Sequence, residues 1–277
     1  MSAKKMKVNR LFAPESGKSV VIAVDHGFYM GNLQGLEAPV AMVKKLIESQ
    51  VDGVLLSFGI GKATVNLFGN KINPSRILAI DHALMYSIPG QQGGVLEHSL
   101  FVGVEEALRW GFDAVKCLLV FGLDRETQRR NFNNIGKLVA ECDRMAMPLM
   151  IEPFPWGYDM PEGKAADPEL IVHCCRIALE CGADILKVPY TGDVKSFRKI
   201  ISQSSVPVLI LGGPKIDNVQ RMLKMVKNAT KAGGRGVVFG RNIWGHKNIK
   251  SLIEALKEVI HSGASVKSIV QKHALGD

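Results

Sequence analysis

Eight short apolar runs, each followed by a stretch with helical spacing, constrain this 277-residue chain more than any other feature. Such runs are typical of buried strands, whereas apolar residues three and four apart are typical of amphipathic helices. Strands that alternate with helices form parallel sheets, and eight of them predict an α/β fold of the closed (β/α)8 TIM-barrel type. The predicted strands are Ser19–Val24, Gly53–Ser57, Arg76–Ile80, Asp113–Val120, Pro148–Glu152, Asp184–Val188, Val206–Leu211 and Gly236–Phe239.

Stretches with helical periodicity predict the outer layer of this barrel. Asp167 and Pro168 predict one helix start, because a side-chain acceptor precedes a proline that needs no N–H partner. The segment 61–75 is less regular, and 88–94, with Pro89 and three glycines, predicts a loop or lid above the barrel. The predicted helices are Glu37–Ser49, Glu97–Trp110, Arg125–Met145, Pro168–Cys181, Asp193–Ser202, Asp217–Lys231, Ile249–His261 and Val266–His273.

Composition narrows the class of protein further. One domain over residues 1–277 is expected, because barrels of this size are commonly single domains. No apolar run approaches the roughly 20 residues that a membrane span needs, and the N-terminal segment lacks a signal-peptide pattern. The five cysteines include no CxxC pair, which favours a reducing, cytoplasmic location without disulfides or zinc. The net charge of +9 is dispersed, so it favours small anionic ligands over nucleic acid.

Ionisable residues occur where four predicted strands end or run. Active sites of such barrels lie at the carboxyl ends of the strands, and a buried strand rarely tolerates an unpaired charge. Asp25 follows the first strand, Lys116 lies in the fourth, Glu152 ends the fifth and Lys187 lies in the sixth. We therefore expect these four side chains to form an active site.

Lys187 is the predicted nucleophile. A lysine on an apolar strand near other cations has its charged form disfavoured, so its free amine can attack a carbonyl group. The resulting protonated imine is an electron sink that stabilises the carbanion left when an adjacent C–C bond breaks. A structural ion pair with Glu152 or Asp25 is the alternative interpretation.

The neighbouring charges have predicted supporting roles. Lys116 would supply the positive charge that activates Lys187, or bind a substrate hydroxyl or phosphate. It would have no such role if it lay on the outer surface of the barrel. Glu152 is the predicted acid/base and Asp25 would orient hydroxyls or assist proton transfer, with a salt-bridged spectator as the alternative for each. This chemistry needs no cofactor.

Glycine-rich turns follow the last two predicted strands. Backbone N–H groups in such turns, together with a helix N-terminus, commonly hold phosphate in these barrels. The predicted phosphate-binding residues are Gly212, Gly213, Lys215, Gly240 and Arg241. A phosphorylated small-molecule substrate is therefore implied.

Two Asp-His pairs, Asp25-His26 and Asp81-His82, leave a metal-assisted reaction open. Carboxylate and imidazole groups can hold a divalent ion that polarises a carbonyl. Neither spacing is a recognised zinc pattern, so we predict no metal and expect both histidines to line the site, with His26 binding substrate.

The motifs that carry a family resemblance are Asn9-Arg10-Leu11-Phe12 with Gly17-Lys18, Val24-Asp25-His26-Gly27, Ile185-Leu186-Lys187, Ile210-Leu211-Gly212-Gly213 and Gly240-Arg241-Asn242-Ile243. Through them nearly the whole chain resembles the archaeal-type class I fructose-bisphosphate aldolases. That family includes a thiolase or aldolase branch acting on a phosphorylated pentanedione derived from a bacterial signal molecule. The resemblance implies that Lys187 is the Schiff-base lysine, that Asp25 is the first-strand catalytic aspartate, and that the glycine turns bind phosphate. It also implies a large ring-based homo-oligomer such as a decamer.

One departure from the family concerns the acid/base. The family's aldolases often have Tyr-Pro-Arg-Gly after the fifth strand, where this chain has Phe154-Pro155-Trp156-Gly157. Phenylalanine cannot transfer a proton, so Glu152 is the expected substitute, in a set that looks like that of the animal-type class I aldolases.

The predicted function is therefore that of a Schiff-base class I aldolase. It would cleave or form a C–C bond in a phosphorylated ketose or diketone, or carry out a related transaldolase- or thiolase-type transfer. A metal-assisted aldolase or isomerase, and a non-catalytic sugar-phosphate-binding protein, are the alternatives, because barrels host many chemistries.

Overall fold

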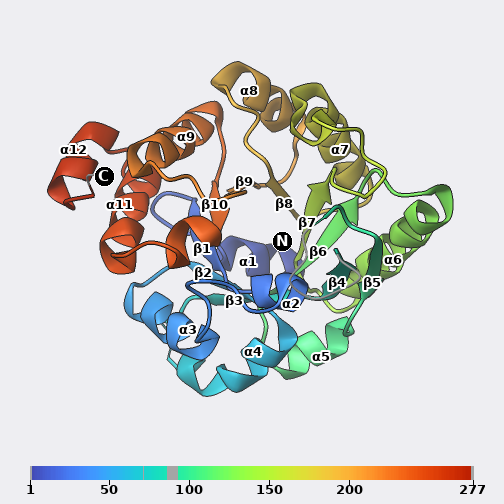
Figure 1. Ribbon diagram of the computed structural model, residues 1–277. Coiled ribbons are helices and arrows are strands. Elements are labelled where there is room, and N and C mark those ends of the chain that lie inside the picture. The colour runs from blue at the N-terminus through green and yellow to red at the C-terminus, as the bar shows by residue number, and fades with distance from the viewer. Residues whose placement is uncertain (1, 71, 86–92, 276–277) are drawn as a thin grey trace.

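The chain folds into a closed barrel of eight parallel strands in the computed structural model, which describes residues 2–70, 72–85 and 93–275 (Figure 1). Around the barrel the strands follow the order β1, β2, β3, β6, β7, β8, β9 and β10, and β10 pairs with β1 to close it. These strands confirm the eight predicted runs. They are β1 (Ser19–Ala23), β2 (Gly53–Leu56), β3 (Ser75–Ala79), β6 (Ala114–Val120), β7 (Leu149–Phe154), β8 (Ile185–Val188), β9 (Val208–Leu211) and β10 (Gly236–Phe239).

Helices surround the barrel (Figure 1). Asp167 accepts a hydrogen bond from the backbone N–H of Glu169, and the helix begins at Pro168, as the sequence predicts. The longer helices are α3 (Pro39–Glu48), α6 (Arg125–Arg144), α7 (Pro168–Glu180), α8 (Val194–Gln203), α9 (Val219–Ala232) and α11 (Ile249–His261). The shorter ones are α1 (Ala3–Arg10), α2 (His26–Met30), α4 (Phe58–Ala63), α5 (Val104–Arg109), α10 (Arg241–Trp244) and α12 (Val266–Lys272), with 3-10 turns η1 (Val65–Phe68) and η2 (Lys164–Ala166).

Two hydrophobic layers hold the barrel together. Residues that alternate along each strand belong to different clusters: Val20 and Ile22 pack under the helices, whereas Val21 and Ala23 pack inside the barrel. The interior cluster also contains Phe12, which follows α1, so this N-terminal segment closes the end of the barrel at which the strands begin. This period of two decides which side chains can reach the interior.

One predicted helix was wrong in its first part. Residues Glu97–Leu100 form strand β5, which pairs antiparallel with β4 (Asp81–Leu84), and only Val104–Arg109 are helical. His98 is buried while Glu97 and Ser99 are exposed, which is the alternation of a half-buried strand. At Glu97–Leu100, pairing with β4 therefore outweighs the helical spacing of apolar residues over 97–110.

The sequence did not predict helix α1 or the β4–β5 hairpin, and one predicted loop cannot be compared in full. Of the predicted lid at 88–94, residues 88–92 lie outside the described residues. None of the helices within 2–70, 72–85 and 93–275 is both long and apolar enough to cross a membrane.

Candidate active site

A cavity of about 460 Å³ lies at the carboxyl ends of the barrel strands. Asp25, Lys116, Glu152 and Lys187 all line it, as predicted, and all four are buried. The cavity is lined by residues including Asp25, His26, Tyr29, Met30, Met85, Lys116, Leu118, Glu152, Phe154, Trp156, Lys187, Tyr190, Gly212, Gly213, Gly240 and Arg241.

The pleat of the strands explains why charged side chains enter this interior. On β6, Ala114 and Leu118 belong to the interior cluster, and Lys116 lies between them at the same parity. The same alternation directs Glu152 inward beyond Met150 on β7, and Lys187 inward beyond Ile185 on β8. Lys116 is only 2% exposed, so the alternative that it lies on the outer surface is wrong.

Glu152 joins the two lysines. Its Oε2 lies 2.8 Å from Lys187 Nζ and 3.1 Å from Lys116 Nζ. Burial opposes ionisation of the Glu152 carboxyl, but the charges of Lys116 and Lys187 outweigh this and lower its pKa below the ordinary value. Glu152 is therefore a carboxylate in the resting site, within reach of a proton on Lys187.

Lys116 is surrounded by negative charge and an aromatic ring. Besides Glu152, Asp81 Oδ1 lies 3.9 Å from its Nζ, and the centroid of the Tyr29 ring lies 5.3 Å away. Burial disfavours the ammonium form, but the neighbouring carboxylates prevail and raise the pKa of Lys116 well above its ordinary value. Lys116 therefore keeps its charge. Because Glu152 lies between the two lysines, the predicted activation of Lys187 by Lys116 is partly offset, and that role stays a prediction.

Asp25 and His26 form the opposite part of the wall. His26 Nδ1 lies 3.3 Å from Asp25 Oδ1. Burial raises the pKa of the Asp25 carboxyl, but the contact with His26 and the charges of Lys116 and Lys187 together lower it below the ordinary value. Gly240 lies against the imidazole so closely that a Cβ there would come 2.3 Å from His26 Cε1. A larger residue at this position would therefore force the His26 imidazole to move.

The two glycine turns lie side by side at one end of the cavity. Asn242, just after the second turn, donates from Nδ2 to Gly212 O at 2.9 Å and accepts at Oδ1 from Ile216 N at 2.7 Å. Gly213 adopts a φ of 62°, which favours glycine. The joining role of Asn242 was not predicted. The sequence showed only its place in the turn.

Arg241 lines the same cavity at the start of α10. Its Nε is buried and has no hydrogen-bond partner among the described residues, and burial lowers the pKa of the guanidinium. A half-buried cation that pairs with no acidic side chain among the described residues suits an anionic ligand. Lys215 does not line the cavity although it follows the same turn as Gly213, so the structure does not bring it to the site.

The two Asp-His pairs do not form one constellation. His82 packs its ring against Phe28, at 4.8 Å between centroids, while Asp81 accepts a hydrogen bond from His98 instead. Among the described residues the group of three or more candidate metal donors is Asp81, His98 and Cys117, not the predicted pairs. Burial raises the pKa of the Cys117 thiol well above its ordinary value, and Asp81 already accepts two hydrogen bonds at Oδ2. This donor set fits a hydrogen-bond network better than a metal ion.

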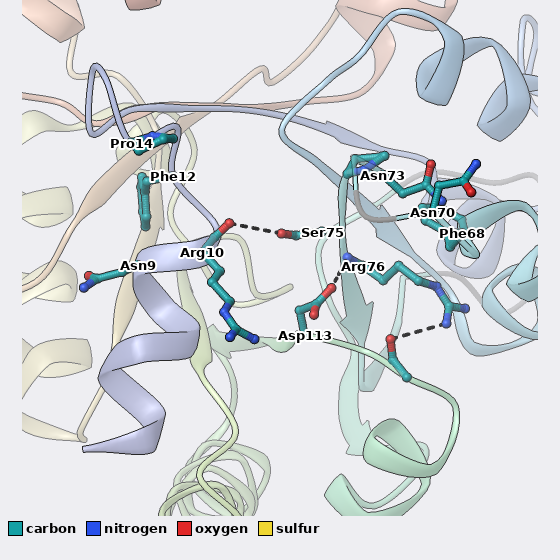
Figure 2. Close-up of a pocket in the computed structure, with 12 residues that line it drawn as sticks. Asn9, Arg10, Phe12, Pro14, Phe68, Asn70, Asn73, Ser75, Arg76 and Asp113 are labelled. Carbon is teal, nitrogen blue, oxygen red and sulfur yellow. Dashed lines mark hydrogen bonds between the residues drawn. The ribbon is translucent and has the colours of Figure 1, made fainter. Parts of the chain in front are cut away.

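A second cavity, of about 620 Å³, lies at the end where the strands begin. Figure 2 shows Arg10 and Phe12 on one side of it, and Ser75, Arg76 and Asp113 on the other. Ser75 Oγ donates to Arg10 O, and Asp113 accepts from the backbone N–H of Arg76 at 2.8 Å. No predicted site residue lines this cavity, which separates it from the chemistry.

The barrel and its buried lysine–carboxylate–lysine cluster define a class of enzyme, the lysine-dependent barrel aldolases. The comparison with known proteins is specific: the profile of the DeoC/LacD family aldolases matches residues 19–246. The chain belongs to this family, and it is an aldolase-type lyase of the Schiff-base-forming class. The resemblance stated from the sequence is thereby confirmed.

Individual relatives cover nearly the whole chain. A protein described as an uncharacterized aldolase, from Saccharolobus solfataricus, is 32% identical over 96% of this chain and 97% of its own length. The 2-amino-4,5-dihydroxy-6-oxo-7-(phosphonooxy)heptanoate synthase of Streptomyces griseus is 27% identical over 95% of this chain and 92% of its own. A solved archaeal fructose-1,6-bisphosphate aldolase, with its catalytic lysine covalently bound to the carbinolamine intermediate of the substrate, is 27% identical. It covers 94% of this chain and 100% of its own, with a TM-score of 0.80.

Proposed function

We propose that this aldolase makes or breaks a C–C bond in a phosphorylated ketose or diketone through an imine on Lys187. The observation that carries the proposal is the 2.8 Å contact between Lys187 Nζ and Glu152 Oε2, inside the cavity that Arg241 lines. An amine beside a carboxylate can lose its proton locally, and a cation that pairs with none of the described acidic residues can hold a phosphate in the same cavity.

Imine formation uses Lys187 and Glu152. Lys187 gives one proton to Glu152, and the neutral amine adds to the keto carbon of the substrate. A second amine proton passes to the former carbonyl oxygen, which gives a carbinolamine. Glu152 returns its proton to this hydroxyl, which leaves as water, and the nitrogen lone pair forms the protonated imine. Glu152 is then a carboxylate again.

Bond cleavage follows from the imine. The hydroxyl on the β carbon loses its proton to Glu152, the bond between the α and β carbons breaks, and the β carbon leaves as an aldehyde. The electron pair of that bond moves to the imine and forms an enamine. Glu152 returns the proton to the α carbon, and water releases the ketone and restores Lys187. Synthesis is the reverse of these steps.

Asp25 and Lys116 hold the substrate in this scheme. Both charges face the cavity, so Asp25 accepts hydrogen bonds from substrate hydroxyls. Lys116 donates to the oxygen on the β carbon, which gains negative charge as it loses its proton. His26, in contact with Asp25, extends this binding surface. Gly212, Gly213, Gly240 and Arg241 hold the phosphate, whose distance from Lys187 selects the keto compound.

The relatives suggest which keto compound is used. In fructose 1,6-bisphosphate and in the heptanoate made by the Streptomyces synthase, the keto carbon lies next to the carbon that carries phosphate. A substrate with this keto-phosphate unit would place its carbonyl at Lys187 and its phosphate at Arg241. Phe154 lines the cavity where the family often has tyrosine. This protein can therefore differ from the family in how it contacts the acceptor part of the substrate.

Borohydride reduction tests the proposal directly. The protein is incubated with fructose 1,6-bisphosphate or dihydroxyacetone phosphate, reduced, and digested for mass mapping. We expect a stable adduct on Lys187 that is absent from Lys187→Arg, and an unchanged adduct in Lys215→Gln, a lysine outside the cavity. An unmodified protein with both probes and with other ketose phosphates would contradict the proposal and favour a sugar-phosphate-binding protein. Turnover that a chelator abolishes would favour the metal-assisted alternative.

Location and assembly are part of the same proposal. We place the protein in the cytoplasm, because its five cysteines are free and four of them are buried. We expect a homo-oligomer, up to the size of a decamer, without nucleic acid or membrane partners. Exposed apolar side chains such as Phe101 and Met6 are candidates for the contact between subunits. Light scattering of the purified protein measures the number of subunits.

A further inference from the structure

We propose that Asp81, His98 and Asn131 form a chain of positioning residues that holds the Lys116 ammonium in place during turnover. The proposal rests on the function proposed for Lys116 and Glu152. None of the three residues lines the active-site cavity, so they would act only through Lys116. The chain runs from helix α6 through the β4–β5 hairpin to strand β6.

The direction of each hydrogen bond follows from the first one. Asn131 Oδ1 accepts from the backbone N–H of Val120 at 3.0 Å, so its Nδ2 must donate to His98 Nδ1, which lies 2.8 Å away. His98 Nδ1 is therefore the acceptor of the ring and Nε2 carries the hydrogen. Nε2 then donates to Asp81 Oδ2 at 2.8 Å. The imidazole is neutral in this arrangement and its orientation is set by Asn131.

Asp81 uses its two oxygens differently. Oδ2 accepts from His98 and from the backbone N–H of Leu118 at 2.7 Å. Oδ1 faces Lys116 Nζ at 3.9 Å and the Tyr29 hydroxyl at 3.4 Å. Because Oδ2 is held by two donors, the carboxylate cannot rotate without breaking both bonds. Oδ1 is thereby kept toward Lys116.

The side chains of Asp81, His98 and Asn131 are all buried. Asp81 and Asn131 are 0% exposed and His98 is 4% exposed. Burial alone would raise the pKa of the Asp81 carboxyl, but the charge of Lys116 and the hydrogen bonds from His98 and Leu118 hold it well below its ordinary value. Asp81 thus carries a negative charge next to Lys116 at neutral pH. In a buried, low-dielectric interior such a charge acts strongly on its neighbour.

The proposed reaction shows why Lys116 needs this second carboxylate. Glu152 is neutral while it holds the proton taken from Lys187, and at that moment Lys116 loses one of its two close anionic partners. Asp81 cannot be neutralised in the same step, because it has no contact with Lys187. It therefore keeps the Lys116 ammonium charged and close to the reacting oxygen when Glu152 carries a proton.

A double-mutant cycle tests this role. Asp81→Asn keeps the shape but turns a neutral amide toward Lys116, and we expect it to lower kcat by about tenfold or more with little change in KM. In the Lys116→Met background, Asp81→Asn should change kcat by less than about twofold, because the group that it positions is gone. The turnover assay uses fructose 1,6-bisphosphate, and thermal melting is followed for every variant.

A second pair of variants keeps the test decisive if Asp81→Asn does not fold. His98→Gln retains an N–H donor for Asp81, whereas His98→Ala removes it. We expect His98→Gln to restore most of the kcat that His98→Ala loses, at equal or lower melting temperature. Equal activity of these two variants, or the same loss from Asp81→Asn with and without Lys116, would overturn the proposal. So would a stoichiometric metal ion, measured by elemental analysis, that His98→Gln fails to retain.

The adduct experiment separates this proposal from the proposed function. If borohydride reduction of the imine fixes the substrate on Lys187 of the wild-type protein but the cycle is additive, only the positioning role fails. If the wild-type protein forms no adduct, the aldolase mechanism fails first.

Discussion

Lys187 Nζ donates a hydrogen bond to Glu152 Oε2 across 2.8 Å in the interior of the barrel. The same oxygen lies 3.1 Å from Lys116 Nζ, so one carboxylate is shared by two ammonium groups. Removing one partner of a buried charged group is costly, which ties these three residues together in stability as well as in chemistry. Both activity and folding must therefore be measured for substitutions of these three residues.

Glu152→Gln should separate imine formation from turnover. Glutamine keeps the shape of the side chain but cannot carry a proton, so we expect kcat to fall by about 10²–10⁴. The borohydride-trapped adduct on Lys187 should still form, more slowly, because the nucleophile is intact. Steady-state turnover and mass mapping on the same preparation check this. Undiminished turnover would remove Glu152 from the mechanism.

Arg241→Gln should weaken recognition of phosphate. The Arg241 guanidinium is half-buried and its Nε has no partner among the described residues, so an anion is its expected counter-charge. Loss of a charge-assisted hydrogen bond of about 1.5–3 kcal/mol corresponds to a KM roughly 10–100-fold higher for fructose 1,6-bisphosphate.

The control for this prediction is Lys215→Gln, on the neighbouring turn but outside the cavity. It removes the same charge and should leave KM within about twofold. A similar rise in both variants would point to the general field of the protein and not to a phosphate site at Arg241.

Gly240→Ala should damage the site by steric conflict. The new Cβ would lie 2.3 Å from His26 Cε1, so the imidazole and its contact with Asp25 must move. Overpacking of this kind typically costs 1–3 kcal/mol, and we expect kcat/KM to fall by about tenfold or more. Gly27→Ala is the matched control, since a Cβ at Gly27 would meet no atom within 4 Å. Equal activity of the two variants would show that the site adapts.

Acid should destabilise the wild-type protein more steeply than Asp81→Asn. The folded pKa of Asp81 is depressed, so the stability that it contributes is present above its unfolded pKa of about 3.9 and is lost as the pH falls toward the folded value. One such group contributes a slope of up to about 1.4 kcal/mol per pH unit below pH 4.

Urea unfolding between pH 6 and pH 2.5 measures this slope. Asp81→Asn should show a flatter acid limb, and Asp159→Asn, an exposed carboxylate, should follow the wild-type curve. Parallel curves for wild type and Asp81→Asn would contradict the depressed pKa of Asp81.

Much of the fold could be predicted because a strand that is buried on both faces must consist largely of apolar residues. Each barrel strand is a short apolar run, and the alternation along a run determines which side chains share a face. Lys116, Glu152 and Lys187 could thus be assigned to one cavity from their places in three strands. The predicted helix over Glu97–Trp110 was wrong at its start, because a partner strand at Asp81–Leu84 decides the conformation of Glu97–Leu100.

The sequence by itself determined the order of strands and helices and the ionisable groups that enter the barrel, since both depend on periodicity along the chain. Only the tertiary structure decided that Glu152 is shared by two lysines, that His98 and Asn131 support Asp81, and that Lys215 lies outside the site. These contacts join residues from different strands and helices. Their distances depend on barrel closure and helix packing, which cannot be derived from any single stretch of sequence.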